Sequence, residues 1–376
     1  MLSDFFYGIN YTTIYRSIKM KIPLNRPTIT KKDAKSFKKL AVLDIFSDEA
    51  IKKFENKFAG YIGRKYAIST NSGTSALHLA LLALDIKEKD EVICPSYTCV
   101  ALLNAISYVK AEVKLVDCNF NVEKSDFNIS FLDLKKKISL KTKVIIVPHM
   151  FGFPAEIEKI IKFGIPVIED ATQSLGGEYL SKKLGSYGAI SIFSVHSSKM
   201  MTTGSGGVFL TDSKDLFEKA KFLGDYESTI VAQRLKKPDS YNVQYNYKIS
   251  DLNAYLGTSQ LDQLNQFVKK RKNIAKAYGR SLKSVAKIPF LSKENIFWRY
   301  MIEINKNPIE VIKEATKYGI EIGRGVYPPL HQYLKMRDDL FKNTKKATSS
   351  LIALPIYPSM TAKEINYLMK ILIKIL

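Results

Sequence analysis

Residues 190–210 have the sequence ISIFSVHSSKMMTTGSGGVFL, in which two apolar runs flank a segment of small polar residues with a single lysine, Lys199. The apolar runs predict two strands, and the Ser/Thr/Gly segment predicts the turn between them. A lysine held in a partly dry pocket at such a turn loses its proton more easily and becomes a nucleophilic amine. The alternative is a solvated surface lysine, and the other motifs of the chain bear on that choice.

A second segment of small polar residues, 71–75, lies between a short predicted strand at residues 66–70 and an apolar helix that continues to Leu84. The helix is apolar on all sides, so we expect it to be buried, with the N–H groups of its first turn shielded from water. A phosphate satisfies such groups, and Gly73 lets the backbone approach it closely. Gly73, Thr74 and Ser75 are therefore candidate phosphate ligands. The alternative is that Thr74 or Ser75 only caps the helix.

Apolar strands and helices alternate from residue 91 onward. Strands are predicted at residues 91–95, 113–116, 144–149 and 165–170, with helices such as 97–109 between them. This alternation is typical of an α/β fold with a mostly parallel sheet and helices on both faces, whose ligands bind at the carboxyl ends of the strands. Asp170 ends one of these strands. The alternative for Asp170 is a helix cap for the segment that follows.

One surface of this fold would gather a phosphate site, the carboxylate of Asp170, the amide of Gln173, the hydroxyl of Ser194 and the amine of Lys199. This set matches pyridoxal phosphate, because a carboxylate keeps the ring nitrogen protonated, an amide meets the phenolic oxygen and an amine attacks the aldehyde. No Gly-x-Gly-x-x-Gly pattern follows the first strand and no P-loop lysine occurs, which argues against a dinucleotide or ATP.

The composition is that of a globular protein, with 376 residues of which 46% are hydrophobic and 25% charged. No apolar run approaches the roughly 18 residues of a membrane-spanning helix, and the N-terminus lacks the apolar core of a signal peptide. Three cysteines and four scattered histidines predict a reduced, cytoplasmic protein with no metal site. The net charge of +22 favours anionic ligands; a membrane surface is a weaker alternative, and no nucleic-acid-binding motif occurs.

The sequence predicts three parts. Residues 1–21 are an aromatic and basic extension, which we expect to pack on the body of the protein. Residues 22–268 form a large cofactor-binding domain, near whose end a long helix begins at Ser250 and continues into basic residues 269–272. Residues 269–376 form a smaller α+β domain, with a Gly/Pro-rich loop at residues 323–331 of the kind that carries function.

Seven motifs follow one another along the chain. They are residues 71–77 (NSGTSAL), 169–174 (EDATQS), 193–199 (FSVHSSK), 204–207 (GSGG), 245–251 (YNYKISD), 327–331 (YPPLH) and 354–355 (LP). From about residue 22 to the C-terminus, the chain resembles the DegT/DnrJ family of pyridoxal-phosphate-dependent nucleotide-sugar aminotransferases. The resemblance implies the aspartate-aminotransferase fold, fold type I. It also implies transfer of an amino group from an amino acid, with glutamate as the expected donor, to a keto group of a nucleotide-diphosphate sugar, for cell-surface polysaccharide (O-antigen) or glycoconjugate synthesis.

The resemblance assigns roles to individual cofactor-binding residues. Lys199 is expected to bind the cofactor covalently and to move a proton during transamination. Asp170 is expected to pair with the pyridine nitrogen, and Gln173 to contact the phenolic oxygen. The residues expected to hold the phosphate are Thr74, Ser75 and Ser194, next to Gly73.

The resemblance also implies a partner and a substrate loop. Asn246 is expected to reach the cofactor of a neighbouring subunit, which makes the protein a homodimer with shared active sites. The residues expected near the sugar nucleotide are Arg324, Tyr327 and His331.

The chain departs from the family pattern at Cys99, where the family usually has an aromatic side chain over the pyridine ring. The neighbouring aromatic, Tyr97, is the candidate replacement. The family includes dehydratases in which a histidine replaces the lysine, so the presence of Lys199 favours transamination. Two alternatives remain, a cofactor-dependent sugar dehydratase and a non-catalytic regulator with the same fold; the second rests on Cys99 and the N-terminal extension.

Overall fold

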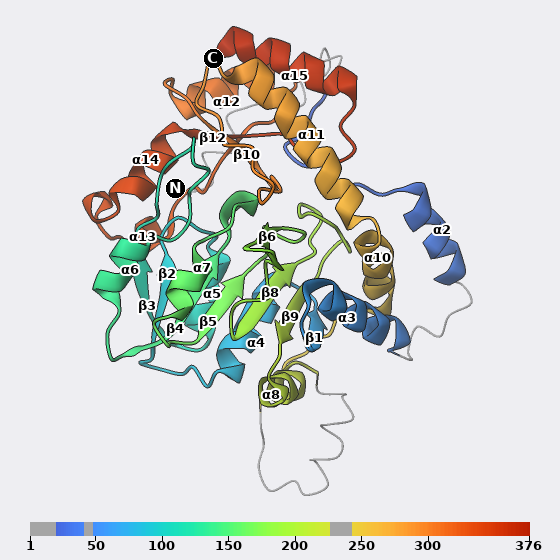
Figure 1. The fold of residues 1–376 in the computed structure, drawn as a ribbon, viewed down its shortest axis with the longest axis vertical. Helices are drawn as coiled ribbons and strands as arrows, with labels where there is room; N and C mark the ends of the chain where they lie inside the picture. Colours follow the sequence, from blue (N-terminus) through green and yellow to red (C-terminus); the bar gives the residue numbers. More distant parts are fainter. Residues whose placement is uncertain (1–19, 41–47, 226–242) are drawn as a thin grey trace, which may run out of the picture.

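The computed structural model describes residues 20–40, 48–225 and 243–376. A seven-stranded sheet in the order β1-β9-β8-β5-β4-β2-β3 forms its centre (Figure 1). β9 is antiparallel to both of its neighbours, and the other six strands are parallel to one another. The mostly parallel sheet predicted from the sequence is confirmed. Its strands are β1 (Tyr66–Thr70), β2 (Glu91–Pro95), β3 (Glu112–Val116), β4 (Thr142–Pro148), β5 (Val167–Asp170), β8 (Ile190–Ser194) and β9 (Gly207–Thr211).

Helices cover both faces of this sheet. One face is covered by α4 (Gly73–Ala83), α5 (Ala101–Tyr108) and α8 (Lys214–Gly224). The other is covered by α3 (Glu49–Ile62), α6 (Phe131–Lys137), α7 (Ile157–Ile161) and α10 (Asp251–Leu261), and α2 (Lys31–Leu40) packs beside α10. Successive residues of a strand face opposite sides, so Ile146 of β4 packs on the first face while Ile145 and Val147 pack on the second. This explains why the buried strands are apolar throughout rather than alternating.

A smaller antiparallel sheet lies above the large one, in the order β10-β12-β11. It contains β10 (Tyr300–Glu303), β11 (Gly323–Arg324) and β12 (Leu351–Leu354), and it is surrounded by α12 (Pro308–Lys317), α13 (Leu330–Tyr333), α14 (Lys342–Ser350) and α15 (Ala362–Ile375). β10, β12, α12, α14 and α15 contribute to one hydrophobic cluster, whereas Leu330 of α13 packs with the cluster of the large sheet. The region corresponds to the predicted α+β domain. A two-stranded hairpin, β6 (Glu178–Tyr179) and β7 (Lys182–Lys183), follows β5 in the large sheet's half of the molecule.

α11 (Leu264–Leu282) connects the two halves of the molecule (Figure 1). Its first residues, such as Leu264, pack with the large sheet's helices, whereas Tyr278 and Leu282 pack with the small sheet. The domain boundary predicted at residues 268–269 therefore falls inside a continuous helix. The start of the predicted large domain also contacts the smaller one, because Ile22 pairs with Ile320.

Two helix predictions need correction. The helix predicted from Ser250 to residue 272 is broken at residues 262–263, because the N–H of Gln263 donates to the oxygen of Gln260, three residues back, at 3.0 Å. The helix predicted from residue 97 begins only at Ala101. Residues 97–100 form bends and a turn instead, which follow Ser96, whose N–H donates to the oxygen of Val116 at 2.7 Å.

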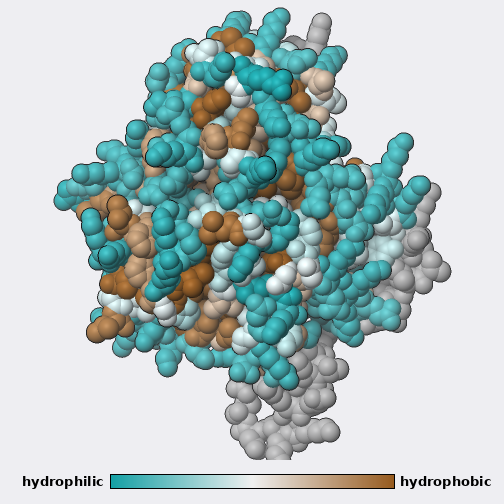
Figure 2. Space-filling view, viewed as in Figure 1, coloured by the Kyte–Doolittle hydropathy of each residue, from teal (hydrophilic) through white to brown (hydrophobic). Residues whose placement is uncertain are grey.

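The surface shown in Figure 2 is mainly hydrophilic, with hydrophobic side chains in separate patches between the polar ones. This agrees with a sequence whose lysines are spread along the whole chain. Residues 1–19 of the predicted N-terminal extension lie outside the described residues.

Candidate functional site

A cavity of about 230 Å³ opens at the carboxyl ends of β5 and β8, beside the N-terminus of α4. Six of the residues singled out in the sequence line it: Gly73, Thr74, Cys99, Asp170, Ser194 and Lys199. The structure therefore brings the three separate motifs to one site, as the rule for parallel sheets predicts. The other lining residues are Ser72, Leu77, Ala101, Leu102, Thr172, Ile192, His196, Ser205 and Gly206.

Lys199 lies on the loop between β8 and β9, which pair with each other as antiparallel strands. The loop is held by backbone hydrogen bonds, including Val195 N to Gly206 O and Ser197 N to Gly204 O, both 3.0 Å. The Nζ atom of Lys199 lies 4.6 Å from the ring centre of Trp298. Burial lowers the pKa of Lys199, and the positive charge of Arg299 adds to this effect, while the nearby carboxyl of Asp170 opposes it. The predicted strand–turn–strand arrangement is confirmed, and Lys199 is half-buried rather than fully solvated.

Asp170 is the last residue of β5, and its side chain is buried at the edge of the cavity. Its Oδ1 accepts a hydrogen bond from the N–H of Thr172 at 3.0 Å. Burial raises the pKa of Asp170, and the hydrogen bonds from Thr172 and the charge of Lys199 work in the opposite direction. A buried carboxylate in this position gains stability when a cationic group lies opposite it.

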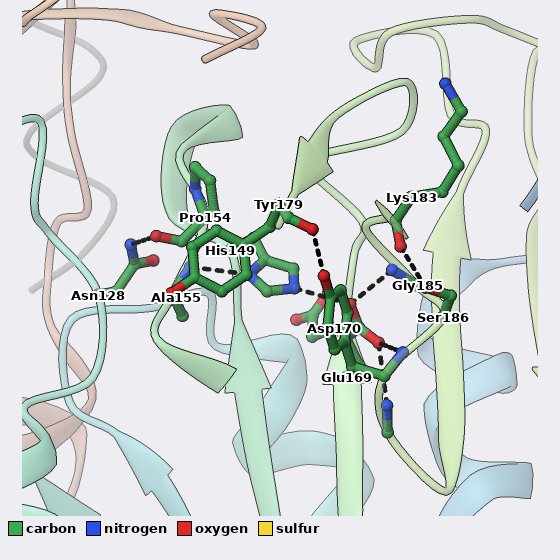
Figure 3. Close-up of polar contacts among 12 residues, drawn as sticks. Asn128, His149, Pro154, Ala155, Glu169, Asp170, Tyr179, Lys183, Gly185 and Ser186 are labelled. Carbon is green, nitrogen blue, oxygen red and sulfur yellow. Dashed lines mark hydrogen bonds and ion pairs between the residues drawn. The ribbon is translucent and has the colours of Figure 1, made fainter. Parts of the chain in front are cut away.

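The residue before Asp170 is the centre of a buried polar network on the opposite side of β5 (Figure 3). Glu169 is fully buried, and its carboxylate accepts from His149 Nε2 at 2.9 Å and from the N–H groups of Gly185, Tyr187 and Gly188. His149 Nδ1 accepts from the N–H of Ala155 at 3.0 Å, so the ring proton is on Nε2. Burial alone would raise the pKa of Glu169, but the hydrogen bonds from His149 and from the backbone outweigh it and lower the pKa.

The network ties β4 to β5 at the point where Asp170 enters the cavity. His149 follows β4, and its own N–H donates to the oxygen of Asp170 at 3.1 Å.

The Glu169→Gln variant should lose about 3–5 kcal/mol of unfolding free energy, because the neutral amide removes a buried charge that several donors face. Urea unfolding followed by circular dichroism measures this loss. The control is Glu178→Gln, whose ion pair with Lys183 is exposed and should contribute under about 1 kcal/mol. Equal losses in the two variants would contradict the prediction.

The N-terminus of α4 faces the cavity with backbone N–H groups that can donate to a ligand. Ser72 caps the helix by accepting from the N–H of Ser75 at 3.1 Å, so neither Thr74 nor Ser75 is the cap. Among the described residues, no acceptor takes the N–H groups of Gly73 and Thr74. A side chain at Gly73 would place its Cβ 3.1 Å from the Cβ of Ser194, so Ser194 would have to shift by a few tenths of an ångström to admit any other residue here.

Three of the predicted cofactor ligands differ in how they face the cavity. Ser194 lines it directly. Ser75 does not, because its hydroxyl donates to Asn71 Oδ1 at 2.6 Å and contacts Ser72. Gln173 is buried and does not line the cavity; its Oε1 accepts from the N–H of Phe151 at 2.7 Å, and its contact with the phenolic oxygen stays a prediction.

Cys99 is exposed and lines the cavity. The candidate replacement for the missing aromatic, Tyr97, is fully buried and does not line it. Its ring packs against the edge of Phe151, and its hydroxyl oxygen accepts from the N–H of Val326 at 3.4 Å. Tyr97 therefore does not take the place of the missing aromatic in this structure.

The predicted substrate loop lies outside the cavity. Arg324 stacks on the ring of Tyr327 at 3.4 Å, and the Tyr327 side chain is 57% exposed. His331 is fully buried, and its two ring nitrogens contact Ser96 Oγ at 2.7 Å and Asp338 Oδ1 at 2.9 Å. Both polar atoms of His331 are thus used within the chain, and its role near a sugar nucleotide stays a prediction.

Asn246 is exposed, and its side chain makes no hydrogen bond within the described part of the chain. Its backbone pairs with Asp225, and its oxygen accepts from Asn71 Nδ2 at 3.3 Å. Asn246 therefore lies close to the segment that carries the phosphate ligands. Its predicted contact with a neighbouring subunit stays a prediction.

Sequence reasoning missed two groups of residues at this site. The first is the pair His149 and Glu169; the available signal was a charged residue inside an apolar strand. The second is Trp298 and Arg299, which lie about 100 positions after Lys199 in the sequence and gave no signal of their own. Trp298 donates its Nε1–H to the oxygen of Ser198 at 2.8 Å and so holds the lysine loop.

The described residues contain no group of three or more His, Cys, Asp or Glu side chains arranged to hold a metal ion. None of the helices they form is both long and apolar enough to cross a membrane.

Comparison with known proteins agrees with the site. The sequence model of the DegT/DnrJ/EryC1/StrS aminotransferase family matches residues 28–373. GDP-perosamine synthase of Escherichia coli O157:H7 is 31% identical over 360 residues, which are 92% of this chain and 96% of that protein. A putative sugar aminotransferase of Streptococcus pneumoniae, Spr1654 in its PMP form, superimposes with a TM-score of 0.83 at 22% identity over 95% of this chain and 98% of that one. A GDP-4-keto-6-deoxymannose-3-dehydratase superimposes equally well, with a TM-score of 0.83 at 22% identity over 94% of this chain and 100% of that one.

The chain belongs to the DegT/DnrJ/EryC1/StrS aminotransferase family. It is a pyridoxal-phosphate-dependent sugar aminotransferase with fold type I, as the sequence predicted. The dehydratase shares the fold at low identity, so the fold by itself does not distinguish the two reactions.

Proposed function

We propose that this protein transfers an amino group from an amino acid, with glutamate as the first candidate, to a keto group of a nucleotide-diphosphate sugar used in cell-surface polysaccharide synthesis. The observation that carries the proposal is the placement of Lys199 and Asp170 in one cavity, beside the free N-terminus of α4. The relationship to GDP-perosamine synthase supports a sugar nucleotide as the acceptor. The +22 net charge supports an anionic substrate.

The residues of the cavity fit pyridoxal phosphate. The unpaired N–H groups of Gly73 and Thr74, the dipole of α4 and the Ser194 hydroxyl would hold the phosphate. Asp170 would pair with the ring nitrogen and keep it protonated. When bound, the cofactor supplies an electron-withdrawing ring that accepts the electrons left when a bond at the substrate carbon breaks.

Lys199 would have two tasks. Its amine would hold the cofactor covalently between catalytic cycles, and in each half-reaction Nζ would move the proton of the substrate carbon that carries nitrogen. Both tasks need the uncharged amine, and burial in the cavity favours that form. The dehydratase alternative is disfavoured because a lysine occupies this position.

The pH dependence of cofactor attachment tests the state of Lys199. In cofactor-free protein, the rate of covalent attachment should rise with pH with a midpoint below 10.5, the value of an exposed lysine, because burial lowers the pKa. Stopped-flow absorbance at a series of pH values measures it. Asp170→Asn should move the midpoint further down, since Asp170 is the carboxyl that raises this pKa. A midpoint at or above 10.5 would contradict the prediction.

The proposal extends to the assembly and the place of action. The protein forms a homodimer in which Asn246 of one subunit reaches the cofactor of the other. The 324–331 loop lies near the sugar nucleotide. The enzyme acts in the cytoplasm, where both substrates are present. The exposed position of Asn246 supports this arrangement.

The deciding experiment follows the absorbance of the purified protein with pyridoxal phosphate, before and after glutamate is added. A band of covalently bound cofactor that bleaches with glutamate and returns with one member of a panel of keto-sugar nucleotides supports the proposal. An amino sugar identified by mass spectrometry would complete it. Release of water without an amino product would favour the dehydratase, and failure to bind the cofactor would favour the regulator.

A further inference from the structure

α11 and α15 are neighbouring helices whose exposed charges are all positive. α11 contains six lysines and arginines and no Asp or Glu. α15 contains three lysines and a single acid, Glu364, which is buried and pairs with Arg26 at 2.8 Å. The two helices lie side by side and pack on one hydrophobic cluster (Figure 1). Their outer faces therefore form a common surface to which neither helix contributes an exposed acidic residue.

The exposed cations of each helix lie in line along its outer face. They are Lys269, Lys276 and Arg280 in α11 and Lys363, Lys370 and Lys374 in α15. In both helices the spacing is seven and then four residues, which brings the side chains back to the same face of an α-helix. Each row is about 16 Å long at the rise of an α-helix. The opposite face of α11, with Tyr278 and Leu282, is buried in the hydrophobic cluster. We call the six cations the basic face.

The cations of the basic face have no acidic partners, unlike many other lysines of the surface. On α12, for example, Lys317 pairs with Glu314 at 2.6 Å. No ion pair joins any of the six to a carboxylate of residues 20–40, 48–225 or 243–376. Lys374 donates to the hydroxyl of Tyr318 at 2.9 Å. Positive charges gathered on one surface repel one another, so an anionic partner that covers them gains the attraction of all six.

Exposed apolar side chains lie beside these cations. Ile373, next to Lys374, is 49% exposed. Leu291 is 38% exposed and flanks α11, because its Cδ1 would lie 3.6 Å from a Cβ at Gly279. A lipid surface accommodates both kinds of side chain, since its phosphate groups attract cations and its interface takes up apolar groups. A nucleic acid would attract the cations but leave the apolar side chains in water.

We propose that the basic face docks this protein on an anionic lipid surface. The proposal goes beyond the transfer of an amino group, because none of the six residues lines the cavity at Lys199. Each cation brought near such a surface strengthens binding by about fivefold. The attraction reaches about 10 Å in 0.1 M salt and is screened at higher salt, so we expect the docking to be reversed by salt.

Co-sedimentation of the full-length protein with lipid vesicles tests this docking. We expect the protein to sediment with vesicles of equal parts phosphatidylcholine and phosphatidylglycerol, to stay in solution with phosphatidylcholine alone, and to be released by salt. The variant with Lys269→Gln, Lys276→Gln and Arg280→Gln removes half of the basic face. It should bind the anionic vesicles about 100-fold more weakly, because three cations at about fivefold each are lost.

The matched control removes three lysines elsewhere on the surface, with Lys135→Gln, Lys136→Gln and Lys141→Gln. These side chains are exposed in α6 and in the loop that follows it. The control has the same net charge as the α11 variant, so an effect of net charge alone would weaken both equally. We expect the control to bind within about threefold of the natural protein. Equal losses in the two variants, or no binding by the natural protein, would overturn the proposal. Both variants should keep the natural circular dichroism spectrum.

Two further measurements decide between a lipid surface and a nucleic acid. Ile373→Ser should weaken vesicle binding about three- to tenfold, because the apolar side chain is no longer taken up at the interface. Polyuridylate at the same phosphate concentration as the vesicles should leave the protein on the vesicles. Displacement by polyuridylate, or undiminished vesicle binding by Ile373→Ser, would contradict the lipid assignment, and displacement would favour a nucleic acid as the partner.

Discussion

Lys199→Ala is expected to lose both half-reactions, with a fall of at least about 10³-fold in the rate of cofactor bleaching by glutamate. The side chain is proposed to act both as the covalent attachment point and as the group that moves the proton, and proton transfer alone contributes about 10²- to 10⁴-fold. Single-turnover absorbance measures the rate. The variant should still bind the phosphate of the cofactor, because Gly73, Thr74 and Ser194 are unchanged.

A matched variant separates this chemical role from a role of charge alone. Lys199→Arg keeps a cation near Trp298, but a guanidinium stays protonated and cannot act as the uncharged amine. This variant should therefore be as inactive as the alanine variant. Lys183→Ala, which removes an ion pair with Glu178 outside the cavity, should keep the natural rate. Turnover by Lys199→Ala within tenfold of the natural rate would remove Lys199 from the mechanism.

Asp170→Asn should cause the second largest fall in the rate of cofactor bleaching, and it should differ from Lys199→Ala in its absorbance spectrum. Removing one partner of a buried ion pair costs about 3–5 kcal/mol, which corresponds to a loss of roughly 10²- to 10⁴-fold in rate if the pair is needed in the transition state. Covalent attachment should survive, because Lys199 remains. The expected result is therefore a protein that shows the bound cofactor in its spectrum but bleaches slowly with glutamate, as measured by stopped flow.

The control for this variant is Asp126→Asn, which alters another carboxyl of the large domain whose pKa is raised by burial. Asp126 lies outside the cavity and bonds to Asn119 and Asn128, so its loss should leave the bleaching rate within about threefold. A natural rate in Asp170→Asn would contradict the pairing of this carboxylate with the ring nitrogen. Loss of covalent binding in the same variant would instead indicate that Asp170 is needed to hold the cofactor within reach of Lys199, because removing this carboxyl lowers the pKa of Lys199 and favours its uncharged amine.

The sequence predicted the sheet well because the strands are apolar on both faces, which only a covered parallel sheet permits. Ile190–Ser194 and Gly207–Thr211 were predictable as strands, and Lys199 as the residue between them, from local composition alone. The rule that ligands bind at the carboxyl ends of parallel strands then placed Asp170 beside Lys199. Family resemblance supplied the roles, not the geometry.

Contacts between distant segments were not predictable in the same way. The pairing of His149 with Glu169 depends on the register of β4 against β5, which local patterns do not specify. Trp298 contacts the lysine loop from a segment that follows α11, the helix that carries the chain into the small-sheet half of the molecule (Figure 1). The break before α11 has no Gly or Pro to mark it; the side chain of Gln263 hydrogen-bonds to Asp33 instead of exposing itself to water.

The path of α11 has a consequence for how the enzyme exchanges its substrates. A single helix passes from one half of the molecule to the other, and Arg271, in its middle, donates to backbone oxygens of the segment before β10 and of the segment after β12. A continuous helix of this kind offers no flexible hinge at residues 268–269 about which the two halves of the molecule could rotate apart. We therefore expect donor and acceptor to enter a cavity that is already formed, without a swing of the two halves about residues 268–269.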